Sequence, residues 1–128
     1  PRADAANAVL FRAIALVGSH ARGDARPDSD VDLILLCFEP ERYLRTTEWI
    51  SVFGEPLRFS IEDWGKARSV RVFYRGGIEV EFSLAALDWA AVPLNPGTAH
   101  VLRNGSRVLL DRDGSLREAL EDLARTIP

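Results

Sequence analysis

Two aspartates separated by one residue stand where an apolar run begins. They are Asp30 and Asp32, and the segment VDLILLCF, from Val31 to Phe38, is typical of a buried β-strand. Alternate residues of a strand point to the same face and lie about 6.5–7 Å apart, so these carboxylates repel each other unless a cation lies between them. Carboxylate oxygens are ligands that Mg²⁺ prefers. The spacing therefore predicts a magnesium site, although the segment PDSD is also ordinary turn chemistry.

A short glycine-containing loop, VGSHARGD, precedes the aspartates. Gly18 lets the backbone approach a ligand closely, and a helix with Ser19 as its N-cap would direct free N–H groups and a hydroxyl at an anion. Arg22 follows one turn later and could reach the same anion, whereas we expect His20 to form a local hydrogen bond. Phosphate groups on one side and a divalent metal on the other are the usual way of holding a nucleoside triphosphate. The two segments together indicate a nucleotide site.

The same segments carry a family resemblance. GSHARG followed by SDVD resembles the signature of the nucleotidyltransferase superfamily, in which Gly-Ser and Arg-Gly precede Asp-x-Asp. Three further segments, WISVFGEP, FYRGGIEVEFSL and VLLDRDG, look like the N-terminal domain of streptomycin-type aminoglycoside 6-adenylyltransferases and occur in the same order. The similarity extends over roughly residues 10 to 114 and is loose outside the first motif.

The resemblance implies a polymerase-β-like nucleotidyltransferase fold and an adenylyltransferase activity. It implies that the protein transfers a nucleoside monophosphate, AMP from ATP, to a hydroxyl group of a small-molecule acceptor such as an aminoglycoside, as antibiotic-resistance enzymes do. Two Mg²⁺ ions would serve as cofactors. The phosphates would lie against Gly18, Ser19 and Arg22. The metal ligands and catalytic residues would be Asp30, Asp32 and a third acidic residue on a neighbouring strand.

Two glutamates of the segment IEVEFSL, Glu79 and Glu81, are the candidates for the third acidic residue. In a strand both point to one face, and the apolar residues between them point to the other. The segment VEFSL resembles the Ile-Asp-apolar-Thr-Leu strand of the streptomycin-type enzymes, which favours Glu81, with Glu where that family usually has Asp. The residues alone leave the choice open, because glutamates on a half-exposed hairpin can simply face solvent.

Two alternative functions share the expected fold. A minimal nucleotidyltransferase of the toxin–antitoxin type would modify a partner protein, and a non-catalytic module would bind a nucleotide without turnover. The toxin–antitoxin enzymes are short like this chain, but the long separation of Asp32 from Glu81, with a helix between them, is closer to the aminoglycoside type. The small-molecule acceptor is therefore the favoured interpretation.

Hydrophobic periodicity predicts the elements that must position these residues. The expected helices cover residues 2–11, 40–54 and 115–127, and the expected strands cover 13–18, 31–38, a segment from 57 and part of 106–114. A hairpin over 69–84 turns at Gly76 and Gly77. A strict two-residue turn would point Val70 and Val72 to the glutamate face, so we expect a bulge there. The order of elements predicts an α/β (α+β) fold, a mixed twisted sheet with helices packed on one face.

Composition limits the kinds of partner. The chain of 128 residues is the size of one domain, residues 1–128, which could be the N-terminal part of a longer protein because it begins at Pro1 and lacks Met. A net charge of −3 and a pI near 5.4 argue against a nucleic-acid-binding surface. A single cysteine, Cys37, and no apolar run of membrane-spanning length favour a cytoplasmic protein. In the antibiotic-modifying relatives a following helical domain or a second subunit completes the acceptor pocket, so we expect such a domain or a homodimer.

Overall fold

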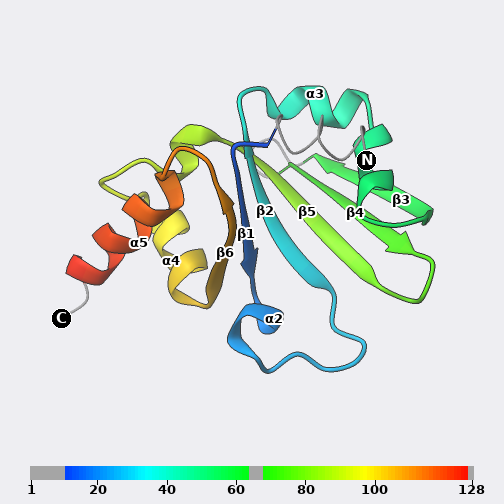
Figure 1. The fold of residues 1–128 in the computed structure, drawn as a ribbon, viewed down its shortest axis with the longest axis horizontal. Helices are drawn as coiled ribbons and strands as arrows, with labels where there is room; N and C mark the ends of the chain where they lie inside the picture. The colour runs from blue at the N-terminus through cyan, green and yellow to red at the C-terminus, as the bar shows by residue number, and fades with distance from the viewer. Residues whose placement is uncertain (1–10, 64–67, 127–128) are drawn as a thin grey trace.

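The structure, a computed structural model, describes residues 11–63 and 68–126. Its strands are β1 (Ala13–Val17), β2 (Val31–Cys37), β3 (Pro56–Asp63), β4 (Arg68–Tyr74), β5 (Glu79–Ala86) and β6 (Ser106–Asp111). They form one six-stranded sheet in the order β3-β4-β5-β2-β1-β6 (Figure 1). Neighbouring strands are antiparallel except β2 and β5, which run parallel. The mixed α/β sheet predicted from the sequence is therefore confirmed.

The described helices agree in part with the predicted ones. They are α2 (Ser19–Arg22), α3 (Pro40–Arg45), α4 (Pro96–Arg103) and α5 (Ser115–Thr126), with 3₁₀ helices η1 (Glu48–Val52) and η2 (Leu87–Ala90). The segment predicted as one helix over 40–54 is divided into α3 and η1 at Thr46 and Thr47, whose β-branched side chains disfavour helix. The helix predicted over 2–11 lies, apart from Phe11, outside the described residues. No helix in the described part of the chain is both long and apolar enough to cross a membrane.

Apolar residues pack on both faces of the sheet because consecutive residues of β2 alternate between them. Leu33, Leu35 and Cys37 belong to a first core, which α3 and η1 cover, and Ile34 and Leu36 belong to a second core, which η2, α4 and α5 cover. In Figure 1, α4 and α5 lie beside β6, at the end of the sheet away from β3. The expectation that helices pack on one face is therefore wrong in this detail. A continuous apolar strand is typical of a sheet covered on both sides, and the unpredicted α4 supplies part of the second cover.

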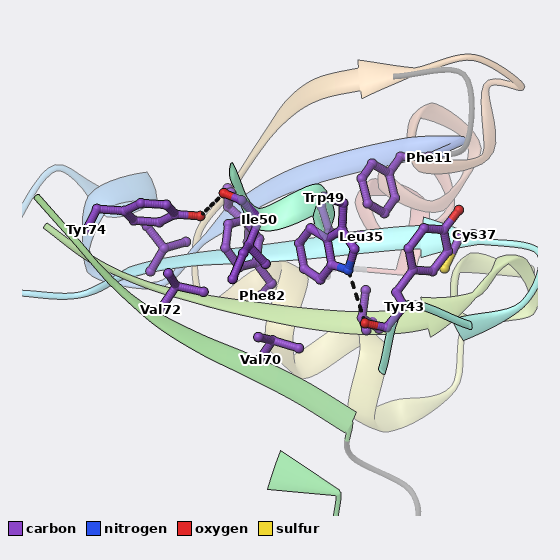
Figure 2. Close-up of a cluster of buried hydrophobic side chains, with 13 residues drawn as sticks. Phe11, Leu35, Cys37, Tyr43, Trp49, Ile50, Val70, Val72, Tyr74 and Phe82 are labelled. Atoms are coloured by element: carbon purple, nitrogen blue, oxygen red, sulfur yellow. Dashed lines mark hydrogen bonds between the residues drawn. The ribbon is translucent and has the colours of Figure 1, made fainter. Parts of the chain in front are cut away.

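The first core is built around the aromatic side chains of α3 and η1. Trp49 packs edge-on against Phe82 of β5, with ring centroids 5.1 Å apart, and its Nε1–H donates to the Tyr43 carbonyl oxygen at 3.0 Å. The Tyr74 hydroxyl donates to the Ile50 carbonyl oxygen at 2.8 Å. Figure 2 shows both bonds among the packed side chains. They satisfy buried polar groups and attach η1 to α3 and to the β4–β5 hairpin.

The β4–β5 hairpin turns through three residues instead of two. The Tyr74 N–H donates to the Ile78 carbonyl oxygen at 2.8 Å, and the Gly77 N–H donates to the Tyr74 carbonyl oxygen at 3.2 Å, so residues 75–77 form the loop. The longer turn brings the valines of β4 to the first core, opposite the glutamate face. The paired residues of β4 and β5 show no register shift, and the extra loop residue provides the change of face for which a bulge was expected.

Candidate active site

Asp32 and Glu81 are direct partners across the parallel strands β2 and β5. Both side chains point to the face of the sheet that carries the second core. Further along β2 that core buries Ile34 and Leu36, whereas Asp32 and Glu81 are only partly buried. The parallel pairing thus places two carboxylates side by side, at the end of the strands where the loop after α2 leads into β2 (Figure 1).

The two aspartates of the motif differ electrostatically. Burial, as the largest cause, and the negative charges of Asp30 and Glu81 together raise the pKa of Asp32 to about 6. The pKa of Asp30 is lowered instead, chiefly because Arg71 donates a hydrogen bond to its carboxylate. Of the two aspartates, Asp30 is therefore the one that is directly bonded to a cation, whereas Arg71 acts on Asp32 only through its charge.

Gly18 brings the backbone of the loop against Asp32. A Cβ at Gly18 would lie 2.7 Å from Oδ2 of Asp32, and the residue has a φ of +77°, so a side chain is excluded by both contact and conformation. The first bond of α2 runs from the Arg22 N–H to the Gly18 carbonyl oxygen at 3.1 Å. Gly18 is therefore the N-cap, and Ser19, which we predicted at that position, is the first residue of the helix.

Arg22 points away from Asp32 and Glu81. Its guanidinium donates to Oδ2 of Asp24 and to the Asn104 carbonyl oxygen, both at 3.1 Å, so it points toward the turn between α4 and β6. His20 lies with Nε2 3.2 Å from the Ser29 carbonyl oxygen, which is the local hydrogen bond predicted for it. His20 thus closes the loop that leads to β2, while Arg22 braces α2 from the other side.

Arg71 of β4 is the residue that the sequence analysis missed. It is the register partner of Glu81, and its guanidinium donates to Asp30 at 2.8 Å, to Glu81 at 2.9 Å, to Glu79, and to Glu62 of β3 at 3.3 Å. These carboxylates raise the pKa of Arg71, with Glu79 and Asp30 as the largest causes. A signal exists in the sequence, since this arginine interrupts the valines of β4, but the face and the register come only from the hairpin.

The carboxylate cluster is therefore held together by a guanidinium. Asp30, Glu62, Glu79 and Glu81 share Arg71, and Asp32 lies next to Glu81. Within residues 11–63 and 68–126, no three acidic, histidine or cysteine side chains converge on a point where one metal ion could bind. The donor chemistry still fits a hard divalent cation, because Asp30, Asp32 and Glu81 supply carboxylate oxygens on neighbouring positions of β2 and β5.

A cavity of about 380 Å³ adjoins the cluster on the same face of the sheet. Its lining includes Glu62, Glu81, Arg68, the hydroxyl-bearing residues Ser69 and Ser83, and Trp89 of η2. It is partly open to solvent and combines acidic, basic, hydroxyl and aromatic groups. Such a lining suits a polar ligand.

Comparisons with known proteins concern the family and the fold. A sequence model of the streptomycin adenylyltransferase family matches residues 3–125. The solved structure of an aminoglycoside 6-adenyltransferase from Bacillus subtilis superposes with a TM-score of 0.50 at 14% identity, over 69% of this chain and 34% of the other. A CCA-adding enzyme in complex with CTP matches with a TM-score of 0.41 at 16% identity, over 94% of this chain and 31% of the other.

The chain spans about a third of the length of these solved structures. No curated protein matches it. At 14% identity the Bacillus subtilis structure shows a shared fold alone, and the family follows from the sequence match, which covers almost the whole chain. The chain belongs to the streptomycin adenylyltransferase family.

Proposed function

We propose that this domain transfers a nucleoside monophosphate, AMP from ATP, to a hydroxyl group of a small-molecule acceptor in a reaction that requires Mg²⁺. The observation that carries the proposal is the pairing of Asp32 with Glu81 across β2 and β5, next to Asp30 and against the backbone of Gly18. It joins the two motif halves, which are far apart in the chain, at one end of the sheet. Family membership supports the reaction class.

Asp30, Asp32 and Glu81 are the residues that would hold the metal. When bound, Mg²⁺ would neutralise phosphate charge and polarise the phosphorus that is attacked. Gly18 and Ser19 bind the phosphates, because the first amides of α2 precede its first internal bond and point away from the helix. Arg22 reaches the phosphates only after its guanidinium leaves Asp24 and Asn104.

Glu81 accepts the proton of the acceptor hydroxyl. The acceptor oxygen then forms a bond to the α-phosphorus, and the bond from this phosphorus to pyrophosphate breaks. An acceptor bound in the cavity beside Glu81 would lie within reach of the carboxylate. Its second carboxylate, Glu62, favours an acceptor with both hydroxyl and ammonium groups, which describes an aminoglycoside.

The test measures pyrophosphate release from each of the four nucleoside triphosphates, with Mg²⁺ and a panel of aminoglycosides. Asp30→Asn, Asp32→Asn and Glu81→Gln should each lower the rate by roughly a hundredfold or more. Glu55→Gln removes the same charge from an exposed ion pair with Arg75 and serves as the control. Circular dichroism checks that every variant keeps its fold. An undiminished rate in Asp32→Asn would disprove the assignment.

A non-catalytic nucleotide-binding module is the second candidate. The observation that favours it is the engagement of Asp30 and Glu81 by Arg71, with no convergent metal ligands among the described residues. Binding of Mg²⁺–ATP without pyrophosphate release in the presence of any of the acceptors would indicate this function. Transfer to a protein in place of an aminoglycoside would indicate the toxin–antitoxin type.

A further inference from the structure

Arg71 is bonded to the same carboxylates that the proposed function assigns to the metal. Its Nη1 lies 2.8 Å from Oδ2 of Asp30, and its Nη2 lies 2.9 Å from Oε2 of Glu81. Each bond occupies an oxygen on the side of the carboxylate that faces Arg71. A metal ion held by Asp30, Asp32 and Glu81 would therefore compete with the guanidinium for two of its three ligands.

The position of Arg71 in β4 explains how its side chain can leave Asp30 and Glu81 without disturbing the fold. Its side chain is 27% exposed and lies on the open face of the sheet, while the flanking Val70 and Val72 are fully buried in the first core. The fold of the hairpin therefore depends on the valines. Glu79 and Glu62 also accept from Arg71, so the guanidinium keeps two partners when it leaves the other two.

The charges explain why it is present. Four carboxylates around one guanidinium repel one another strongly when the cation is removed. An arginine cannot lose its charge at physiological pH, so it compensates these carboxylates whenever no other cation is bound. A metal ion that binds without a nucleotide must first break the bonds of Arg71 to these carboxylates, which makes its binding free energy less favourable.

We propose that Arg71 is the resident counter-ion of the carboxylate cluster, and that it lowers the affinity of the protein for free divalent metal by holding Asp30 and Glu81. The inference rests on the proposed function, since it takes Asp30, Asp32 and Glu81 as the metal ligands. Metal that arrives with a nucleoside triphosphate brings additional contacts to Gly18 and Ser19, and these offset the competition. The protein then acquires its metal together with its nucleotide.

The test measures Mn²⁺ binding to the nucleotide-free protein by electron paramagnetic resonance. Arg71→Gln should bind Mn²⁺ roughly tenfold more tightly than the wild type, because one competing ion pair of about 1.4 kcal/mol corresponds to that ratio. Arg71→Lys, which keeps the charge and loses the planar fork, should lie between them. Arg75→Gln removes the same charge from the exposed pair with Glu55 and should bind Mn²⁺ as the wild type does.

A second measurement separates this role from a structural one. In EDTA, Arg71→Gln should have a lower melting temperature than the wild type. When Mn²⁺ replaces EDTA, the melting temperature of Arg71→Gln should rise by more than that of the wild type. A purely structural arginine would, on removal, weaken Mn²⁺ binding. Equal or weaker Mn²⁺ binding by Arg71→Gln would therefore overturn the proposal.

The two proposals fail separately. If Arg71→Gln gains Mn²⁺ affinity and Asp32→Asn removes it, while no triphosphate yields pyrophosphate, the counter-ion role stands and the transferase reaction fails. If the wild type releases pyrophosphate and Arg71→Gln shows no gain in Mn²⁺ affinity, the reaction stands and the counter-ion role is wrong.

Discussion

Replacing Asp32 with Asn should stabilise the metal-free protein at neutral pH. The side chain is partly buried next to Asp30 and Glu81, and these causes raise its pKa to about 6. A carboxyl group whose pKa is higher in the folded than in the unfolded state binds its proton more tightly when folded. Its contribution to stability is therefore present at low pH and is lost as the pH rises from about 4 through about 6.

The magnitude follows from the pKa. A rise from the ordinary value of 3.8 to about 6 corresponds to about 3 kcal/mol of folding free energy, an upper value for a group that solvent partly reaches. Asn has nearly the shape of protonated Asp and no charge. The free energy of unfolding of Asp32→Asn should thus equal that of the wild type near pH 4 and exceed it by up to about 3 kcal/mol near pH 8.

Urea denaturation in EDTA, repeated between about pH 4 and about pH 8, measures this difference. Asp28→Asn removes one negative charge from an exposed position of the same loop and is the control. A gain of the same size at both ends of the pH range would place the effect in packing, and no gain near pH 8 would refute the electrostatic explanation. The same substitution removes a proposed metal ligand, so stability and the proposed activity should change in opposite directions.

Two further substitutions test the loop and the core. Gly18→Ala should lower the free energy of unfolding by about 1–3 kcal/mol more than Gly23→Ala in urea denaturation, because both residues have positive φ but only at Gly18 would a Cβ meet Asp32, at 2.7 Å. Equal losses would contradict the close approach. Phe82→Ala should lower it by about 3–5 kcal/mol, since the ring is fully buried. Phe38→Ala, at a ring that is 72% exposed, should change it little, and similar losses for the two would mean that the first core is wrongly located.

The elements with strong periodicity were predicted well. β1, β2, the hairpin strands and α5 all follow from apolar patterns and match the structure within a few residues. α4 was missed because Pro96 and Gly97 suggest a turn. Pro at the first helical position is in fact a helix-start signal, and Asn95 caps the helix by accepting from the Gly97 N–H at 2.7 Å. The sequence thus contained a signal for the start of α4, but the helix is short, so its apolar pattern spans few turns.

The position of the helices was harder to predict than their existence. β2 presents apolar residues on consecutive positions, so its pattern indicates burial without saying which helix covers which face. In the structure the first core lies under α3 and η1 and the second under η2, α4 and α5. The hairpin shows the same limit, since one additional loop residue reverses the face of every side chain that follows.

The sequence by itself determined the half of the site that is local. Gly18, Asp30 and Asp32 lie within one loop and the start of one strand, where the period of two decides which side chains share a face. Only the tertiary structure decided what lies opposite them. Glu81 reaches Asp32 because β5 pairs in parallel with β2, and Arg71 reaches Glu81 and Asp30 through the register of β4. The alternation of side chains along a strand specifies which face of the sheet they occupy, but it does not specify which residues of other strands lie beside them. Those neighbours are decided by loop length and by the packing of both cores.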